Sequence, residues 1–491
     1  MKPPLELSSV VRSRSLVWAE WLVLGSLFTL CLAVALTQAV NPFPEDGWFA
    51  SQYSLFHRAP GADNYTPIAA PAYLYFAIHV LANFLGLGLE GEFYLGCLVQ
   101  NLAVFLVGVC LCRAHRLLGF GNIGLLVSAL VVLFIQSTLM AQAFWSENAI
   151  LLLMSITLLC SVRIAFPVDD NRRSLLAWSL ALGLTLGLSV ITRVVPIVLV
   201  PGLAWLFHRQ LDRPRARLAS TTVAVCVLAV VLGAMSANLW RFDRFELSNS
   251  AGRHLWQNIS PWADEMLANS AEYQLLKRAD PAIAGKKWWE VPDGKVPGLE
   301  HLSREEMLRL LSWQAITSHP VRYLRTGIEN TALLPRDPPW RLGAWKGPNY
   351  NPLHRDSMLP PLLGPLPALE GGLKRIFYAC RAVWPLVAYG VLLGWMFTAL
   401  IRRWNRLQLG SEMGAPRPDG VTMPGNDHDP TATLRGFLAF ALIVPLWVSC
   451  QIEVVDFRYL LPYLPVLALL MTTTLCYWAQ FTRKLDPIPF Q

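Results

Sequence analysis

The sequence predicts an all-α protein that crosses a membrane many times, and three observations lead to this fold class. Hydrophobic residues make up 54% of the 491 residues and charged residues only 15%, against roughly 25% charged in an average soluble domain. Apolar runs of about 20 residues, the length that crosses a membrane, recur along the chain. The 41 Lys and Arg residues cluster in short loops between these runs, so the net charge of +8 indicates topology rather than a nucleic-acid partner.

Ten of the apolar runs are predicted spans, because flanking side chains can snorkel and let the shorter runs cross. In chain order they cover residues 16–38, 93–112, 123–141, 149–164, 175–191, 194–207, 219–240, 381–401, 434–450 and 460–481. The first run follows basic residues but is too long for the apolar core of a signal peptide. We therefore expect it to remain in the protein as the first span.

An eleventh apolar run, residues 68–87, is predicted to lie on the outer membrane surface as a juxtamembrane helix. Pro67, Pro71 and His79 suit a membrane surface. When this run is not counted as a crossing, every strongly basic loop falls on one side, which is the cytoplasmic side by the positive-inside rule. These basic segments are 113–116, 163–173, 209–217, 402–406 and the tail at 483–484. Both termini are then expected in the cytoplasm.

This topology divides the chain into three expected parts. They are a transmembrane module at 1–240 with its first outer loop at 39–92, an outer domain at 241–376, and C-terminal membrane helices at 377–491 with a cytoplasmic linker at 402–433. The outer domain is expected to be mostly helical. Its stretch LSREEMLRLLSWQAITSHPVRYLRTGIENTALL has apolar residues near helical spacing, and Ser303 and Glu306 have the spacing of a capping box.

Two adjacent acids, Glu45 and Asp46, come directly after the first predicted span, in NPFPEDGWFASQY. Acids in a loop rich in Pro and Gly are often only solvated turn residues. Here, however, ionisable residues from three other segments are predicted to reach the same outer membrane level. The presence of acids and arginines from four segments at the outer membrane level favours a polar site there.

The other three segments contribute Arg193, Glu147 and the trio Glu453, Asp456 and Arg458. Arg193 stands alone in a long apolar stretch at an outer turn, where a charge is costly and by default functional, with snorkelling to the interface as the alternative. Glu147 opens the fourth span, where the helix dipole alone would favour an acid. The trio precedes the last span, and there the alternative is a simple interfacial salt bridge.

Glycosyl transfer from a lipid-linked phosphate would use such a site. A carboxylate at the membrane face takes the proton of an acceptor hydroxyl, the oxygen attacks the anomeric carbon of the sugar, and arginines neutralise the departing phosphate. Burial would raise the pKa of one acid of a close pair, which suits a general base. The lipid tail requires a large membrane part, which this sequence also predicts.

The order of these elements resembles that of the GT-C membrane glycosyltransferases, which use polyprenyl-phosphate sugars and include protein O-mannosyltransferases and lipid A aminoarabinose transferases. PEDGWFASQY is similar to an acidic pattern that follows the first span in that family. The elements that follow in order are YTPIAAPAYLYFAIHVLANFLGLG, CRAHRLLGFG, the acid opening the fourth span, ITRVVP, SHPVRYLR and FRYLLPYLPVLALL. The resemblance covers most of the chain, although each motif is short.

The resemblance implies a GT-C-like fold and the transfer of a hexosyl or pentosyl group from a polyprenyl-phosphate donor to an acceptor hydroxyl. Glu45 or Asp46 would be the general base, and their order, Glu before Asp, leaves open which of them it is. Arg193 and Arg458 would bind the donor phosphate, and Tyr65, Glu147, Tyr459 and His57 would line the substrate pocket.

The expected partners are the polyprenyl-phosphate sugar, a glycan, lipid or protein acceptor, and membrane lipids, with no nucleic acid. The sequence has no second acidic cluster that would require a divalent metal, so no cofactor is expected and the lipid-linked sugar is a substrate. The absence of eukaryotic retention signals favours a bacterial inner membrane, with the active site on the periplasmic side.

Two alternatives stay open at this level. A transporter or flippase of lipid-linked glycans would use Arg193 and the outer acids as a gate, but such proteins usually contain internal repeats and midplane polar groups, and neither is evident here. An O-antigen ligase or polymerase would rely on arginines and an outer histidine, for which His254, His301 and His319 are available. The acidic pair after the first span argues against this second alternative.

Overall fold

The computed structural model describes residues 14–40, 70–137, 146–247, 251–287, 290–292, 296–333, 359–412, 430–452 and 463–485. Throughout these ranges the regular structure is helical, and β-pairing is limited to an antiparallel bridge between Val40 and Leu359. The all-α prediction is confirmed.

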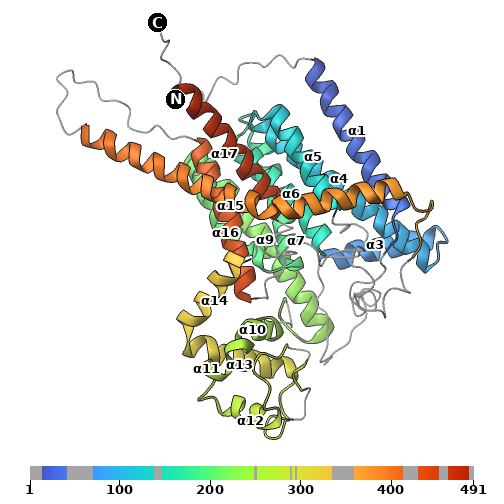
Figure 1. Cartoon of the computed structure of the whole chain (residues 1–491), viewed down its shortest axis with the longest axis vertical. Coiled ribbons are helices and arrows are strands. Elements are labelled where there is room, and N and C mark those ends of the chain that lie inside the picture. Colours follow the sequence, from blue (N-terminus) through green and yellow to red (C-terminus); the bar gives the residue numbers. More distant parts are fainter. Residues whose placement is uncertain are drawn as a thin grey trace.

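The helices form a large bundle, a lobe at one end of it and two helices that run across it (Figure 1). The bundle contains α1 (Arg14–Thr37), α4 (Leu89–Leu117), α5 (Gly121–Ser137), α6 (Ser146–Ala165), α7 (Arg172–Thr192), η2 (Val195–Val198), α8 (Leu199–Gln210), α9 (Arg213–Phe242), α16 (Pro430–Ile452) and α17 (Leu464–Leu485). The lobe contains α10 (Ala251–Ile259), η3 (Ser260–Trp262), α11 (Ala263–Met266), α12 (Ala271–Ala279), α13 (Arg304–Ser318) and α14 (Pro320–Leu333). The crossing helices are α3 (Ala70–Phe84) and α15 (Pro367–Glu412).

Six described helices are long and apolar enough to cross a membrane, and each coincides with a predicted span. They are Trp18–Thr37, Leu89–Leu117, Asn148–Ala165, Arg172–Thr192, Arg213–Phe242 and Thr431–Cys450. Three more predicted spans correspond to the shorter apolar helices Gly121–Gln136, Tyr389–Ile401 and Leu464–Ala479. Large apolar side chains such as Trp18, Trp21 and Leu22 are about two-thirds exposed, as expected for groups that face lipid. The chain is a multi-pass membrane protein.

The remaining predicted span, 194–207, is not one continuous α-helix. The backbone is extended at Arg193, turns through η2, and then forms α8 over only 12 residues. Such a helix is about 18 Å long, against the ~30 Å of the hydrocarbon core. Pro196 inside η2 explains the break, because its ring fixes φ and it has no N–H to donate.

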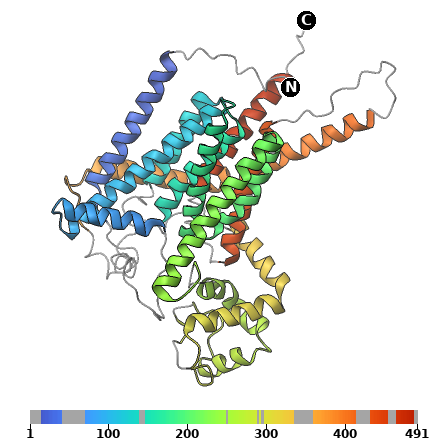
Figure 2. The same cartoon turned by 180° about the vertical axis from the view of Figure 1, so that it is seen from behind.

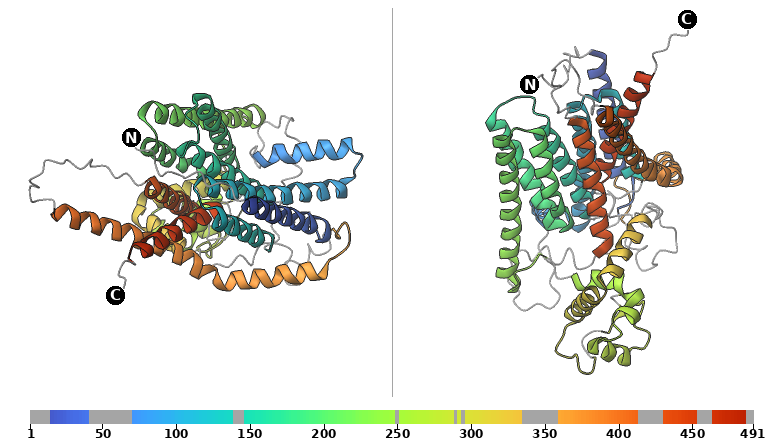
Figure 3. Two further views of the ribbon diagram at one scale, coloured as in Figure 1. Left: turned by 90° about the horizontal axis from the view of Figure 1, so that it is seen from above. Right: turned by 90° about the vertical axis from the view of Figure 1, so that its left-hand side faces the viewer.

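The long helix α15 also differs from the prediction, which expected a crossing at 381–401. It runs across the bundle instead of alongside its neighbours, as the views in Figures 1 and 3 agree. Its first turns pack Leu369 and Leu373 on Leu30 and Val34 of α1, and further on Phe397 stacks on Trp478 of α17 at 5.6 Å. A single helix that contacts opposite sides of the bundle must cross it obliquely. It continues to Glu412, so the expected linker begins later than 402.

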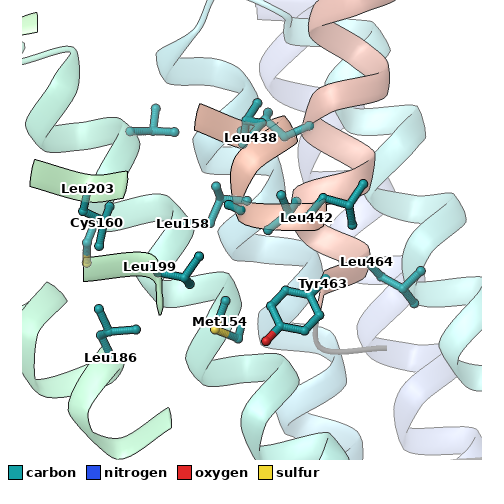
Figure 4. Packing of buried hydrophobic residues seen from close by; sticks show 14 of the residues in the cluster. Met154, Leu158, Cys160, Leu186, Leu199, Leu203, Leu438, Leu442, Tyr463 and Leu464 are labelled. Atoms are coloured by element: carbon teal, nitrogen blue, oxygen red, sulfur yellow. The ribbon is translucent and has the colours of Figure 1, made fainter. Parts of the chain in front are cut away.

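The centre of the bundle is packed by aliphatic side chains from α6, α7, α8, α16 and α17 (Figure 4). Helices α7 and α9 approach closely at Gly183 and Gly187. A Cβ added at these positions would lie 2.5 Å from the Cβ of Cys226 and 2.8 Å from the Cβ of Val230. Two small residues four positions apart let membrane helices approach in this way. The sequence thus explains why α7 and α9 form a close pair.

The lobe has its own core, which includes fully buried Trp256, Tyr273 and Leu308. The lobe lies at one end of the bundle. The C-terminal ends of α4, α6 and α8, which carry basic residues in their last turns, lie at the opposite end (Figure 2). This separation fits the predicted up-and-down topology, in which basic loops alternate with outer segments.

The stretch with helical spacing predicted in the lobe forms two helices, α13 and α14, which meet at His319. Pro320 begins α14 and disfavours helical backbone in the residue before it, so His319 has φ −134° and ψ 57°. The predicted capping box is present. Ser303 Oγ accepts from the Glu306 N–H at 3.3 Å, and Glu306 Oε2 accepts from the Ser303 N–H at 3.1 Å.

Replacing Ser303 by Ala should loosen the start of α13. Loss of an N-cap side chain costs about 1 kcal/mol, so amide exchange in the first turn should become about fivefold faster. Hydrogen exchange followed by mass spectrometry measures this rate. Ser318→Ala is the matched control, because that hydroxyl bonds only the Gln314 carbonyl at the other end of α13. Equal exchange in the Ser303 variant and the wild type would show that the box does not stabilise this helix start.

Candidate active site

The predicted site residues fall partly inside and partly outside the described residues. Glu45, Asp46, His57 and Tyr65 belong to 41–69, and Arg458 and Tyr459 belong to 453–462, and both segments are outside them. Glu147 has its backbone in the first turn of α6, while its side chain is outside the described part. Arg193 is the one predicted site residue whose side chain belongs to the described part of the chain.

Arg193 closes α7 at the turn into η2. Its N–H donates to the Ser189 carbonyl at 2.8 Å, and its backbone is extended with φ −146° and ψ 128°. Its side chain is half-buried, and its charge is close enough to act on the hydroxyl of buried Tyr463, the residue before α17. Arg458 precedes Tyr463 by five residues. Arg193 therefore lies near Tyr463, the residue directly after the segment that carries the second predicted phosphate ligand.

The chain is anchored on both sides of 41–69. Val40 is fully buried and exchanges both backbone hydrogen bonds with Leu359, at 3.0 and 2.9 Å. Glu45 follows Val40 by five residues, so it can lie at most about 17 Å from this anchor. On the other side, α3 begins at Ala70, packs against α4 and α7, and crosses the end of the bundle nearer the lobe (Figure 1). The acidic pair is thus attached to the same end of the bundle as Arg193.

A polar contact fixes α3 on α4. His79 Nδ1 lies 2.9 Å from Glu92 Oε2, and Asn83 Nδ2 donates to His79 Nε2 at 2.9 Å. Glu92 is 7% exposed. From the sequence it has no predicted role and is only the last residue of the expected loop 39–92. The turn between the helices uses Gly86 with φ +67°, a left-handed conformation that glycine adopts without strain. These contacts hold the predicted juxtamembrane helix at a defined place.

The end of α16 is held by the lobe. Asn258 Nδ2 donates to the Cys450 carbonyl at 3.1 Å, and Asn330 Nδ2 donates to Asn258 Oδ1 at 3.1 Å. Tyr389 of α15 donates its hydroxyl to the Ala332 carbonyl at 2.6 Å. Cys450 is two residues from the end of α16, after which the chain enters 453–462. The lobe therefore positions the start of the segment that contains Arg458.

Asn258→Leu should detach the end of α16 from the lobe. Asn258 is 7% exposed, and its replacement removes the 3.1 Å donor of the Cys450 carbonyl, which keeps the longer 3.4 Å bond from Asn330, and also removes an acceptor of the Asn330 amide. Loss of buried polar contacts of this kind costs about 1–3 kcal/mol, which corresponds to roughly 5- to 160-fold faster local opening. Amide exchange in the last turn of α16 measures this. Gln274→Leu is the control, because its amide bonds the Ala268 carbonyl within the lobe. Unchanged exchange in α16 would rule out this anchor.

Four buried carboxamides lie where α1, α4, α5 and α6 meet, and the sequence prediction missed them. They are Gln100 and Asn101 of α4, Gln136 of α5 and Asn148 of α6. Gln136 and Asn148 are at the ends of α5 and α6 joined by 138–145, and Asn148 directly follows Glu147. Amides inside otherwise apolar spans, as in LVQNLAVF, are the signal that could have revealed them, because polar groups within membrane helices are costly.

One end of the bundle thus contains the cation Arg193 and the four buried carboxamides. The segments 41–69 and 453–462, which carry the other predicted ionisable residues, are attached to the same end. Arg193 supplies a positive charge near Tyr463, and neutral amides lie between neighbouring helices. The lobe borders the same end (Figure 1). An anionic lipid headgroup and a polar substituent could be bound side by side at such a place.

No family model matches the chain, and no curated protein matches it significantly. A solved structure with similarity is the crystal structure of ArnT from Cupriavidus metallidurans bound to undecaprenyl phosphate. It has 14% sequence identity and a TM-score of 0.32, over 98% of this chain and 82% of that one.

Proposed function

We propose that the chain is a membrane glycosyltransferase that moves a sugar from a polyprenyl-phosphate donor to an acceptor hydroxyl. One observation carries this proposal. Arg193, a cation in an otherwise apolar stretch, lies near Tyr463 at the end of the bundle to which the segments with Glu45, Asp46 and Arg458 are attached. A phosphate-binding cation and a candidate base could therefore meet at the membrane face.

In the proposed reaction Glu45 or Asp46 accepts the proton of the acceptor hydroxyl. The hydroxyl oxygen then forms a bond to the anomeric carbon, and the bond from that carbon to the phosphate oxygen breaks. The phosphate leaves with the bonding electron pair, and Arg193 and Arg458 neutralise its charge. Tyr65, Glu147, Tyr459 and His57 are proposed to line the sugar pocket. The products are a glycosylated acceptor and polyprenyl phosphate.

The membrane topology supports a periplasmic reaction in a bacterial inner membrane. The basic loops are at the end of the bundle away from the lobe, and the positive-inside rule assigns that end to the cytoplasm. The lobe and the proposed site would then face the periplasm, where lipid-linked sugars and envelope acceptors meet. We propose the parts 1–240, 241–376 and 377–491 as membrane module, periplasmic domain and C-terminal helices on the same basis.

The direct test is transfer by the purified protein in lipid nanodiscs. Undecaprenyl phosphate carrying radiolabelled glucose, mannose or aminoarabinose is offered with an envelope fraction that contains glycans, lipids and proteins. We expect one donor to lose its label to an acceptor in a covalent bond, with release of undecaprenyl phosphate. Vesicles loaded with the same lipids provide the counter-test, since label that crosses the bilayer with no new bond would instead support a flippase.

A further inference from the structure

The four buried carboxamides form a defined hydrogen-bonded cluster. Gln136 Nε2 donates to Asn101 Oδ1 at 2.9 Å and to Cys31 Sγ of α1 at 3.2 Å. Asn148 Nδ2 donates to Gln100 Oε1, and Asn101 Nδ2 donates to the Cys97 carbonyl at 2.9 Å. The side chains are therefore fixed relative to one another by bonds that link four helices.

Two atoms of this cluster have no hydrogen-bond partner among the described residues. They are Gln100 Nε2, a donor, and Gln136 Oε1, an acceptor. Gln100 is 2% exposed and Gln136 is fully buried. Buried polar groups in native proteins are nearly always paired, so an unpaired donor and an unpaired acceptor in one fixed cluster require an explanation. A bound ligand that supplies the missing partners is one.

The location of the cluster limits what this ligand can be. Gln136 and Asn148 flank the connection 138–145, and Cys31 is six residues before the end of α1, which leads into 41–69. The cluster is therefore within about two helical turns of the ends of α1 and α5 and of the start of α6. A group that reaches this depth is more easily delivered by a lipid between helices than by a water-soluble acceptor.

The chemistry of the cluster matches a hydroxyl-bearing, uncharged group. All four carboxamides are neutral, so they offer no countercharge to a phosphate, which Arg193 is better suited to bind. A sugar hydroxyl both donates and accepts, and it can pair with an amide N–H and an amide oxygen at once. We propose that Gln100 and Gln136, fixed by Asn101 and Asn148, form a subsite for the hydroxyls of the donor sugar. This inference rests on the proposed glycosyl transfer and names the residues that bind its sugar.

Lipid binding, measured without turnover, tests this subsite. The probes are undecaprenyl phosphate, undecaprenyl-phosphate-glucose and undecaprenyl-phosphate-mannose, titrated into the full chain in nanodiscs. We expect the wild type to bind at least one sugar-bearing lipid about tenfold more tightly than undecaprenyl phosphate, since two buried hydrogen bonds are gained. Gln100→Met and Gln136→Met should remove most of this preference and change the affinity for undecaprenyl phosphate less than about twofold.

Ser155→Ala is the matched control, because Ser155 is buried in α6 and, among the described residues, its hydroxyl bonds only the Leu151 carbonyl of its own helix. It should keep the full preference for the sugar. Deoxy-sugar lipids give a second measurement on the unmodified protein, where loss of the recognised hydroxyl should lower affinity several-fold. A preference that persists in both Met variants, or a wild type that does not distinguish the three lipids, overturns the subsite. Binding of the sugar with no transfer would leave the subsite intact and refute the proposed reaction.

Discussion

Replacing the proposed general base, Glu45 or Asp46, by its amide is expected to lower the rate of sugar transfer about 10²- to 10⁴-fold. A general base contributes this much, and Glu45→Gln or Asp46→Asn removes the proton acceptor with almost no change in shape. The pair sits five and six residues after the buried anchor Val40, so the amides should not disturb the membrane helices. Single-turnover transfer in nanodiscs, with saturating donor, measures the chemical step directly.

The two single variants also decide which acid is the base. The base variant should lose turnover while its affinity for the donor stays within a few-fold, because the hydroxyl is deprotonated only in the transition state. The neighbouring acid, if it only orients the acceptor, should raise KM more than it lowers kcat. Glu265→Gln, an exposed acid of the lobe, is the control and should leave both constants unchanged. Full activity in both single variants and in the double variant would exclude the mechanism.

The helical fold could be predicted because each membrane span is visible in the sequence as a long apolar run. Nine of the ten predicted spans coincide in sequence with apolar helices, six of them long enough to cross a membrane and three shorter. The exception, 194–207, fails because Pro196 acts on the backbone locally while the hydropathy of the run stays high. Hydropathy also does not give the orientation of a helix relative to its neighbours. It therefore could not predict that α15 runs across the bundle and contacts both α1 and α17.

The candidate site was predictable only in part. Charged residues in apolar surroundings, such as Arg193, stand out because burial of a charge is costly. The carboxamide cluster does not stand out, because Gln136 meets Asn101 only once α4 and α5 pack, and Asn148 meets Gln100 only once α4 and α6 pack. No periodic spacing in the sequence links these residues. The pair Asn258 and Asn330 was missed for the same reason, since both contact α16 from 120 or more residues away. The role of Glu45, Asp46, Arg458, Tyr65, Glu147, Tyr459 and His57 stays a prediction.

Arg193→Gln is expected to lower transfer about 10²- to 10³-fold by removing the charge that we propose stabilises the departing phosphate. This is the typical loss when one electrostatic contact to the developing charge is deleted. The effect should appear in kcat and in the affinity for the product, because undecaprenyl phosphate carries the same group. The inhibition constant of undecaprenyl phosphate, measured with wild type and variant in the same nanodiscs, tests this second effect.

The same substitution separates a binding role from a structural one. Arg193 closes α7 through its backbone N–H, which donates to Ser189, and Gln keeps that bond. Arg193→Lys keeps the charge and should recover part of the activity, although a single ammonium cannot bind phosphate through two parallel bonds as a guanidinium does. Arg209→Gln, at the opposite end of the bundle, should behave like the wild type. If Arg193 only snorkels to the membrane surface, the inhibition constant will not change, because an arginine in the headgroup region contributes nothing to the site.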